Sequence, residues 1–355
     1  MKRIVLTGGG TAGHVSPHEA LLPHLLEEGY EVHYIGTEDG IEHRIMKKYP
    51  EVIYHAVKSG KLRRYFDWKN FSDPFRVIAG NVQSAALMRK IKPNVCFSKG
   101  GFVAVPVVAG AWLHGVPVLC HESDLTPGLA NKLCAPFAKK IATTFPECAE
   151  ALGEKAVCTG TPLRPKIFQG SREKGLAMCG FDGSKSVLLM MGGSLGAQKV
   201  NAALRAALPK LLEKMDVLHL AGRGNLDESL NNVKGYKQFE FLDEELPDAL
   251  ACADYVLSRA GSNALCEFLA LQKPMLLVPY PKGASRGDQI LNAESYRKRG
   301  LAHVLPQEEM TGETLCDALM DLMKDREQLA ENMRKAPAAD GTAAVLQMIH
   351  EIEKK

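Results

Sequence analysis

The sequence predicts an α/β protein made of two doubly wound, Rossmann-like domains that face each other across a cleft. Its 355 residues exceed the roughly 250–300 residues at which a single hydrophobic core stops growing. Short apolar segments alternate with helical stretches along the chain, which is typical of parallel sheets covered by helices. A pattern of strand, glycine loop, helix and strand also occurs once in each half. We therefore expect one such domain per half.

The first pattern lies at the N-terminus. Its parts are a strand at Arg3–Thr7, a glycine loop at 8–13, a helix from Pro17 to about Glu28 and a strand at Glu31–Ile35. Proline suits the first turn of a helix, and Gly29 suits its end. This order of elements predicts a βαβ unit whose first turn carries a glycine loop.

The second pattern begins after the midpoint. Its parts are a strand at Ser186–Met191, a glycine loop at 192–196, a helix from Gln198 to about Lys214 and a strand at 217–221. Further strands are expected at 95–97, 116–120, 141–143, 255–257 and 275–278. Two prolines at 162 and 165 interrupt the pattern between the halves. We therefore expect domains at 1–162 and 163–355, with the final helix able to pack back on the N-terminal domain.

Composition excludes several classes of protein. A net charge of +3 is too small to predict a nucleic-acid partner. Nine cysteines without a C-x-x-C pair predict reduced, mostly buried thiols and a cytoplasmic protein. The apolar run at the N-terminus is too short for a signal peptide, and prolines and glycines interrupt the one long apolar stretch at 102–120. We expect no transmembrane helix.

The glycine loops suit a phosphate group. A glycine turn that opens a helix directs backbone N–H groups and the positive end of the helix dipole at one point. The first loop matches G-x-G-x-x-G, the dinucleotide fingerprint, and Glu38 lies just past the second strand. That match is weak by itself, since any α/β protein can place a tight turn there. Two such loops in one chain favour a phosphate or sugar contact.

Three polar residues near predicted loops are candidates for chemistry. His14 follows the first loop and suits a general base, because its ordinary pKa of about 6.5 leaves it largely neutral at pH 7; a structural histidine capping the turn is the alternative. Pro17 places His14 before the helix, so a metal pair with His18 is not expected. Ser262 is a plausible helix N-cap, and Glu267 suits either a ribose diol or a solvated helix face.

Other polar runs lie where strands are expected to end. The sequence HESD at 121–124 places two carboxylates there, and we expect them to point into the cleft. Arg164 could neutralise phosphate charge, and the amides of DQILN at 288–292 could contact sugar hydroxyls. The residues alone leave surface roles open for both.

Seven motifs, taken together, resemble the MurG family of peptidoglycan glycosyltransferases. They are GGGTAGHVSP at 8–17, SKGGFVAVP at 98–106, HESDLTPGLANK at 121–132, TGTPLR at 159–164, GGSLGA at 192–197, SRAGSNALCE at 258–267 and DQILNA at 288–293. The motifs span nearly the whole chain in the order of the family. The resemblance implies a GT-B fold, a C-terminal domain that binds the nucleotide sugar and an N-terminal domain that faces the acceptor and the membrane.

The resemblance also implies the reaction and its residues. It implies an inverting transfer of N-acetylglucosamine from UDP-N-acetylglucosamine to the C4 hydroxyl of undecaprenyl-diphospho-muramoyl-pentapeptide. By position it makes His14 the general base and assigns substrate contacts to Thr11, Ala12, Gly13, Arg164, Ser194, Leu242, Glu267 and Gln289. Among these, Arg164 and Ser194 meet the diphosphate, Leu242 the uracil and Glu267 the ribose. Gln289 meets the donor sugar, and the first-loop residues form a sugar contact.

This sequence departs from the family pattern at two positions. Asp124 stands where some members carry an asparagine, and Phe102 replaces a tyrosine. Neither changes the class of reaction. No Asp-x-Asp motif occurs in the chain, so we expect no metal and no other cofactor, with the charge on UDP stabilised by helix ends, loop amides and Arg164.

A lipid-linked acceptor predicts a membrane-facing surface. The segment KLRRYFDWK at 61–69, followed by Phe71, Phe75 and Arg76, mixes aromatic rings with cations and suits an anionic membrane surface. A loop and helix packed on the domain is the alternative. The resemblance implies a peripheral protein at the cytoplasmic face of the cell membrane, near cell-wall or division machinery.

Three other functions remain open. A UDP-sugar 2-epimerase would share the architecture and the donor without needing a lipid. An NAD-dependent enzyme would use the fingerprint at 8–13 but leaves the second glycine loop and Arg164 unexplained. A membrane-docked scaffold would bind the nucleotide sugar without turnover.

Overall fold

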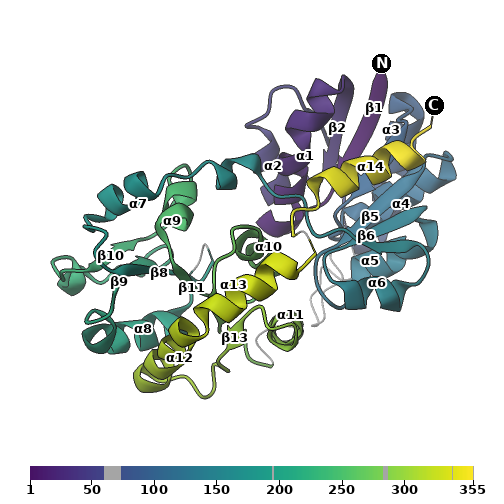
Figure 1. Ribbon diagram of the computed structural model, residues 1–355. Helices are drawn as coiled ribbons and strands as arrows, with labels where there is room; N and C mark the ends of the chain where they lie inside the picture. Colours follow the sequence, from purple (N-terminus) through teal and green to yellow (C-terminus); the bar gives the residue numbers. More distant parts are fainter. Residues whose placement is uncertain (60–72, 194–195, 283–286, 338, 355) are drawn as a thin grey trace. The chain divides into compact units, whose positions relative to one another are not determined.

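The computed structural model consists of two compact units (Figure 1). The first unit comprises Met1–Arg164 together with Asp340–Lys355, and the second comprises Pro165–Ala339. The structure describes residues 1–59, 73–193, 196–282, 287–337 and 339–354. Each unit is an α/β domain with a parallel sheet, which confirms the predicted fold class.

The first unit contains a seven-stranded parallel sheet in the order β3-β2-β1-β4-β5-β6-β7. Its strands are β1 (Lys2–Thr7), β2 (Tyr30–Gly36), β3 (Ile53–Ala56), β4 (Val95–Ser98), β5 (Val118–Glu122), β6 (Lys140–Thr143) and β7 (Ala156–Cys158). Its helices are η1 (Ala12–His14), α1 (Ser16–Glu27), α2 (Ile41–Met46), α3 (Asp73–Ile91), α4 (Ala104–Leu113), α5 (Leu129–Cys134), η3 (Ala135–Phe137), α6 (Pro146–Leu152) and α14 (Thr342–Ile352).

Both faces of this sheet are covered, because successive side chains of a strand point to opposite faces. In β1, Ile4 and Leu6 belong to a core with α1 and α14, whereas Val5 belongs to a second core with α3 and α4. The C-terminal helix α14 therefore completes the core of the first unit. The segment before it is tied to the same unit, since the amide of Gly341 donates to the carbonyl of Thr161 at 2.9 Å.

The second unit contains a six-stranded parallel sheet in the order β10-β9-β8-β11-β12-β13. Its strands are β8 (Ser186–Met191), β9 (Met215–Leu220), β10 (Tyr236–Phe239), β11 (Tyr255–Ser258), β12 (Met275–Leu277) and β13 (His303–Val304). Its helices are η4 (Pro165–Phe168), α7 (Arg172–Cys179), α8 (Gln198–Leu211), η5 (Glu228–Leu230), α9 (Leu246–Cys252), α10 (Ser262–Ala270), α11 (Asp288–Lys298), α12 (Gly312–Lys324) and α13 (Arg326–Lys335).

Helices α8 and α12 cover one face of the second sheet. Leu188 and Met190 of β8 share a core with Leu204 of α8 and Leu319 of α12. On the opposite side α9 contacts β8, and α7 packs on α9. All nine cysteines are free, and Cys158 alone is not fully buried, as the sequence predicted. Within the described ranges, no helix is both long and apolar enough to cross a membrane.

The strand order fixes where each unit can hold a ligand. In the first sheet the order reverses between β1 and β4, and in the second between β8 and β11. Loops that leave the carboxyl ends of such neighbouring strands run in opposite directions and leave a crevice, which is where open α/β sheets bind ligands. Both glycine loops follow a strand at one of these reversals, after β1 and after β8.

Candidate functional site

The first glycine loop leaves β1 and turns directly into η1, which ends at His14. Thr11, Ala12 and Gly13 are exposed, and His14 is half-buried at the end of this turn. The histidine therefore precedes α1, as expected from Pro17. These three residues present exposed surface at the carboxyl edge of the sheet.

One hydrogen bond fixes which ring nitrogen of His14 carries a proton. Nδ1 lies 2.8 Å from the carbonyl oxygen of Gly9. A carbonyl can only accept, so Nδ1–H must be the donor. The Thr11 hydroxyl, 3.2 Å from the same nitrogen, adds a weaker contact. In the neutral ring, Nε2 then keeps its lone pair and is the atom able to take a proton.

The surroundings of His14 keep its ring neutral. Burial lowers the pKa of His14 below its ordinary value of 6.5, and the ammonium of Lys99 lowers it further. The hydrogen bond to Gly9 and the carboxylates of Glu122 and Asp124 act in the opposite direction without reversing the shift. A pKa below 6.5 leaves the ring uncharged at pH 7, which is the state a general base requires.

Lys99 is almost fully buried, with 1% of its surface exposed. Its Nζ donates to Nδ1 of His121 at 2.8 Å and to the hydroxyl of Ser123. His121 in turn donates from Nε2 to the carbonyl of Gly160 at 2.9 Å. A buried cation is stable only when it is hydrogen-bonded, and these partners anchor the start of the loop after β5.

Replacing Lys99 by methionine is expected to raise the pKa of His14. The substitution keeps an unbranched side chain but removes the positive charge that disfavours the imidazolium. The pKa is read from an NMR titration of the histidine ring, and the acid limb of the pH profile of kcat/KM should move to higher pH with it. Lys132→Met, an exposed lysine on α5, is the control. An unchanged or lowered pKa of His14 would contradict this view of Lys99.

His18 belongs to the core and not to a metal pair. It is fully buried, and its ring lies edge-on against Tyr34 and Phe97 at centroid distances of 5.2 and 5.3 Å. Burial lowers the pKa of His18 to about 3. Of the two histidines that the sequence places together, only His14 faces the loop surface.

The carboxylate of Glu122 organises a loop, which differs from the expectation that it points into a cleft. It accepts hydrogen bonds from the amides of Asp124 and Gly128 at 3.0 and 2.9 Å and from the Asn131 side chain at 2.8 Å. These three hydrogen bonds fix the carboxylate to the loop that contains its donors. Glu122 therefore shapes the loop between β5 and α5.

A second carboxylate, from Glu42, meets the first glycine loop. Glu42 is 1% exposed, and its Oε2 accepts from the amide of Gly10 at 3.2 Å. Glu38, which the dinucleotide fingerprint singles out, is exposed. An internal carboxylate thus occupies a loop amide that a pyrophosphate would need in a dinucleotide site, which argues against the NAD alternative. Glu42 was not among the site residues predicted from the sequence.

The second glycine loop follows β8 and leads into α8. Ser194 lies outside the described residues. Gly196 adopts φ +76°, and a Cβ there would come within 2.1 Å of the carbonyl oxygen of Ala221. Only glycine fits such a position. The loop therefore passes close to the end of β9 before it reaches the N-terminus of α8.

The loop after β11 opens α10. Gly261 is the N-cap of this helix, and Ser262 is its first residue and makes no side-chain cap. This corrects the expectation that Ser262 is the N-cap; the loop needs the extended conformation at Gly261. Glu267 is only 8% exposed, so the solvated-face alternative is wrong.

Three segments of the second unit are joined around this loop. The Arg259 guanidinium donates to the carbonyl of Val278 at 2.9 Å and lies over the Tyr280 ring at 4.1 Å. The amide of Tyr280 donates to Oε1 of Gln289 at 3.2 Å. Asn292 donates to the carbonyl of Ala260 at 3.2 Å. The β11 loop, the segment after β12 and α11 therefore form one framework.

Comparison with known proteins identifies the family. The descriptions "Glycosyltransferase family 28 N-terminal domain" and "Glycosyltransferase family 28 C-terminal domain" match residues 4–143 and 187–348. A protein of Geobacillus thermodenitrificans is 55% identical over 349 residues, 98% of each chain; it is named UDP-N-acetylglucosamine–N-acetylmuramyl-(pentapeptide) pyrophosphoryl-undecaprenol N-acetylglucosamine transferase. The chain belongs to the MurG family. A Clostridium tetani protein with the same name is 50% identical, over 98% of this chain and 97% of its own.

Solved structures place this MurG-family chain in the GT-B fold. Acinetobacter baumannii MurG matches with a TM-score of 0.79 and 24% identity, over 99% of this chain and 100% of that chain. A Listeria monocytogenes protein assigned as a UDP-N-acetylglucosamine 2-epimerase also matches, with a TM-score of 0.70 and 13% identity, over 98% and 95%. The fold alone therefore does not separate a transferase from an epimerase.

Two further residues that the MurG resemblance singles out, Arg164 and Leu242, are at least half-buried. Arg164 is half-buried and follows Leu163, whose amide donates to Asp340 Oδ1 at 3.3 Å and Thr342 Oγ1 at 3.2 Å. Leu242 is 6% exposed and follows β10. Their contacts with a diphosphate and a uracil stay predictions.

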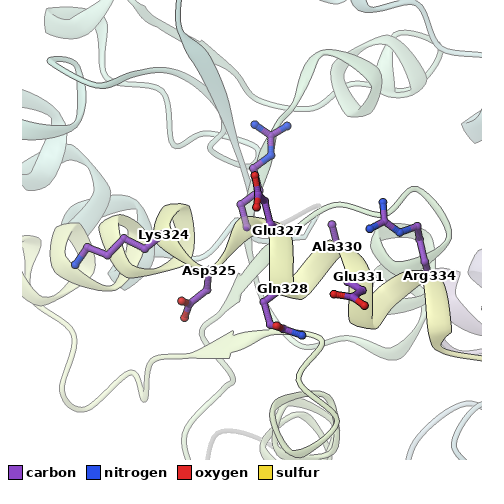
Figure 2. A pocket seen from close by; sticks show the side chains of 8 residues that line it. Lys324, Asp325, Glu327, Gln328, Ala330, Glu331 and Arg334 are labelled. Atoms are coloured by element: carbon purple, nitrogen blue, oxygen red, sulfur yellow. The ribbon is translucent and has the colours of Figure 1, made fainter.

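A surface hollow along α13 does not belong to this site (Figure 2). Side chains of both charges line it, including Asp325, Arg326, Glu331 and Arg334, and it contains none of the residues singled out above. Glu331 is paired with Lys335 at 2.5 Å, and Arg326 with Asp254 at 3.6 Å. In the part of the chain that the structure describes, no three His, Cys, Asp or Glu side chains group as metal ligands.

Proposed function

We propose that the chain transfers N-acetylglucosamine from UDP-N-acetylglucosamine to the C4 hydroxyl of undecaprenyl-diphospho-muramoyl-pentapeptide, the step of peptidoglycan synthesis that turns lipid I into lipid II. The observation that carries the proposal is 55% identity, over 98% of the chain, with a transferase of that name. The described site supports it, because each unit carries a glycine loop at the reversal of its strand order.

In this proposal His14 is the general base. Its Nε2 takes the proton of the acceptor C4 hydroxyl while that oxygen attacks the anomeric carbon of N-acetylglucosamine from the face opposite the diphosphate. The bond between the anomeric carbon and the diphosphate oxygen breaks, and UDP leaves with that electron pair. Attack from the opposite face inverts the anomeric carbon. The orientation of Nδ1 toward Gly9 leaves Nε2 available for this step.

The donor contacts follow from the same family positions. We assign Arg164 and Ser194 to the diphosphate, Leu242 to the uracil, Glu267 to the ribose and Gln289 to the donor sugar, and we assign Thr11, Ala12 and Gly13 to a sugar contact. The N-terminus of α8, directly after the second glycine loop, adds the positive end of a helix dipole for the leaving diphosphate. In this proposal these groups act as preorganised donors, which lower the barrier by stabilising the charge that develops on the diphosphate.

A radiolabel transfer assay tests the proposed function. The protein is mixed with UDP-N-acetylglucosamine labelled in the sugar and a short-chain lipid-linked muramoyl-pentapeptide, with and without a chelator. We expect label in the lipid fraction in both cases. Conversion of the donor sugar without any acceptor would favour the epimerase, and donor binding without turnover would favour the scaffold. Loss of transfer with the chelator would contradict the metal-free mechanism.

We further propose that the chain is a peripheral protein at the cytoplasmic face of the cell membrane, near cell-wall or division machinery. The acceptor's lipid tail stays in the bilayer, so the enzyme has to reach its surface. The segment 61–69 and Phe71, which were predicted to form this surface, lie outside the described residues. The side chains of Phe75 and Arg76 lie outside them too. The support comes from an apolar surface of the first unit.

That surface, here called the α4–α5 patch, consists of Trp112, Leu113, Leu129 and Leu133. The four side chains are 43–65% exposed, and α4 contacts α5. Exposed lysine side chains at 132 and 139 lie beside it in the sequence. Apolar side chains flanked by cations suit the interface of an anionic bilayer.

Replacing Trp112 and Leu133 by glutamine is expected to weaken binding to anionic liposomes by roughly tenfold or more, because burial of one large apolar side chain contributes about 1.5–3 kcal/mol. Liposome sedimentation measures the effect, and UDP binding should not change. Leu226→Gln, at an exposed leucine of the second unit, is the control. Sedimentation equal to that of the wild type would contradict the assignment of the patch.

A further inference from the structure

The peptide group between Gly9 and Gly10 is hydrogen-bonded at both ends. On one side, its carbonyl oxygen accepts from Nδ1–H of His14 at 2.8 Å. On the other side, its N–H donates to Oε2 of Glu42 at 3.2 Å. A buried carboxylate, one peptide group and the His14 ring therefore form a continuous chain of hydrogen bonds.

The surroundings of Glu42 fit a carboxylate in both hydrogen bonding and shape. Its other oxygen, Oε1, accepts from the amide of Thr37 at 3.0 Å and from the Thr37 hydroxyl at 2.6 Å. A Cβ added at Gly9, Gly36 or Gly40 would come within 2.6, 2.8 or 2.1 Å of the Glu42 side chain. The glycines therefore leave the space that the carboxylate fills, and both of its oxygens are occupied.

The Gly9 carbonyl is also enclosed from the far side. A Cβ added at Gly101, which adopts φ +85°, would come within 2.4 Å of that oxygen. Glycine at this position lets the loop after β4 approach the carbonyl closely. The peptide is thus held between the loop after β4 and the Glu42 carboxylate.

We propose that Glu42 is a positioning residue for the His14 base and acts on it through the Gly9–Gly10 peptide. The proposal rests on the proposed function, in which His14 takes the proton of the acceptor hydroxyl. Glu42 lies one peptide group away from the ring and does not touch the reacting atoms.

Polarisation along the hydrogen bonds explains the effect. A carboxylate that accepts from a peptide N–H increases the negative charge on the carbonyl oxygen of the same peptide, and hydrogen bonds in a chain strengthen one another. The stronger acceptor holds Nδ1–H more firmly, which favours the tautomer with the lone pair on Nε2 and makes that nitrogen more basic. The peptide thereby takes the place of a carboxylate in direct contact with a catalytic histidine.

Other charged and titratable groups face the two ends of this chain. Lys99 lowers the pKa of His14, and Glu122 and Asp124 raise it; His14 and Lys99 in turn lower the pKa of His18. Near Glu42, burial followed by the carboxylate itself raises the pKa of the Tyr34 and Tyr54 hydroxyls. None of these groups lies between Glu42 and His14 in the hydrogen-bonded chain.

Glu42→Gln tests the proposal with nearly unchanged shape. Glutamine has one acceptor oxygen, and Thr37 offers two donors to the position of Oε1. The oxygen will therefore stay at Thr37, and the NH₂ group will face the Gly10 amide, where two donors cannot bond. Thr37→Val is the matched control, because it removes a hydrogen bond from the same carboxylate but leaves the Gly10 contact.

In Glu42→Gln we expect kcat to fall roughly tenfold, a fraction of what general-base catalysis contributes, while the KM for UDP-N-acetylglucosamine stays the same. The acid limb of kcat/KM should move to lower pH, and ¹⁵N shifts of the His14 ring should show a smaller share of the Nδ1–H tautomer. Thr37→Val should lower the melting temperature with neither change.

Two results would overturn the proposal. One is a kcat equal to that of the wild type; the other is a lower kcat with an unchanged tautomer and acid limb, which would mark Glu42 as purely structural. If Glu42→Gln does not fold, Glu42→Asp makes the same test, because its carboxylate is one methylene shorter and loses its reach to Gly10. The tautomer is read without substrate, so it tests the positioning of His14 even if the transfer assay fails.

Discussion

Replacing His14 by glutamine is expected to lower kcat for transfer by about 10²–10⁴-fold, the contribution typical of a general base. Glutamine keeps an amide that can donate toward Gly9 but has no group that takes a proton near pH 7. Because we assign the uracil and ribose contacts to the second unit, the Kd for UDP should stay the same. Radiolabel transfer gives kcat, and calorimetry gives the Kd.

A second histidine provides the control for this variant. His24 lies on α1, the helix that follows the loop, and is half-exposed. His24→Gln should retain the activity of the wild type. If His14→Gln transfers sugar at the rate of the wild type, His14 is not the base; if it loses UDP binding as well, its role is structural.

The second large effect is expected at Glu267. We expect Glu267→Ala to raise the Kd for UDP by about 10²-fold or more, since a hydrogen bond to a charged group contributes about 1.5–3 kcal/mol and a ribose diol offers two donors. The carboxylate is buried on α10, which leaves little water to replace the lost contacts. Calorimetry with UDP, and separately with uracil, measures the loss and locates it at the ribose.

Glu294→Gln is the matched control for this prediction. Glu294 lies on α11 of the same unit, where it pairs with Arg297 at 2.7 Å on the surface. Its replacement should leave the Kd for UDP unchanged. An unchanged Kd in Glu267→Ala, with a melting temperature equal to that of the wild type, would remove Glu267 from the binding site.

The central strands of both sheets were predictable because they are buried on both faces and read as continuous apolar runs. The strand expected at Ser186–Met191 has the same bounds in the structure. Its neighbour β11 differs from the expectation by one residue. A strand that is buried on both faces consists almost entirely of apolar residues, which distinguishes it from a loop.

The edge strands were not predicted, because they are not buried on both faces and lack continuous apolar runs. Every residue of β3, β7 and β13 is half-buried or exposed, and each of these strands lies at an edge of its sheet. A strand with one open side needs few apolar residues, so its sequence resembles that of a turn. β10, at the remaining edge, alternates buried and half-buried residues and is four residues long.

The candidate site was predictable where its residues adjoin a glycine loop, as His14 does. The roles of Glu42 and Lys99 were not predictable, because their contacts join residues far apart in the sequence. Glu42, for example, accepts from Gly10 across 32 positions. The sequence holds one usable signal, since Gly36 and Gly40 lie shortly before Glu42 and both make room for its side chain. The role of Arg259 was missed for the same reason, because its carbonyl partner, Val278, directly follows β12, the next strand of the sheet.

The state of the His14 ring is the central claim, and ¹⁵N NMR of the wild-type protein measures it directly. Long-range ¹⁵N–¹H correlations, recorded across a pH titration, distinguish the two neutral tautomers from the imidazolium. We predict a neutral ring at pH 7 with the proton on Nδ1 and a pKa below 6.5. A ring protonated on Nε2 alone, or an imidazolium at pH 7, would contradict the account.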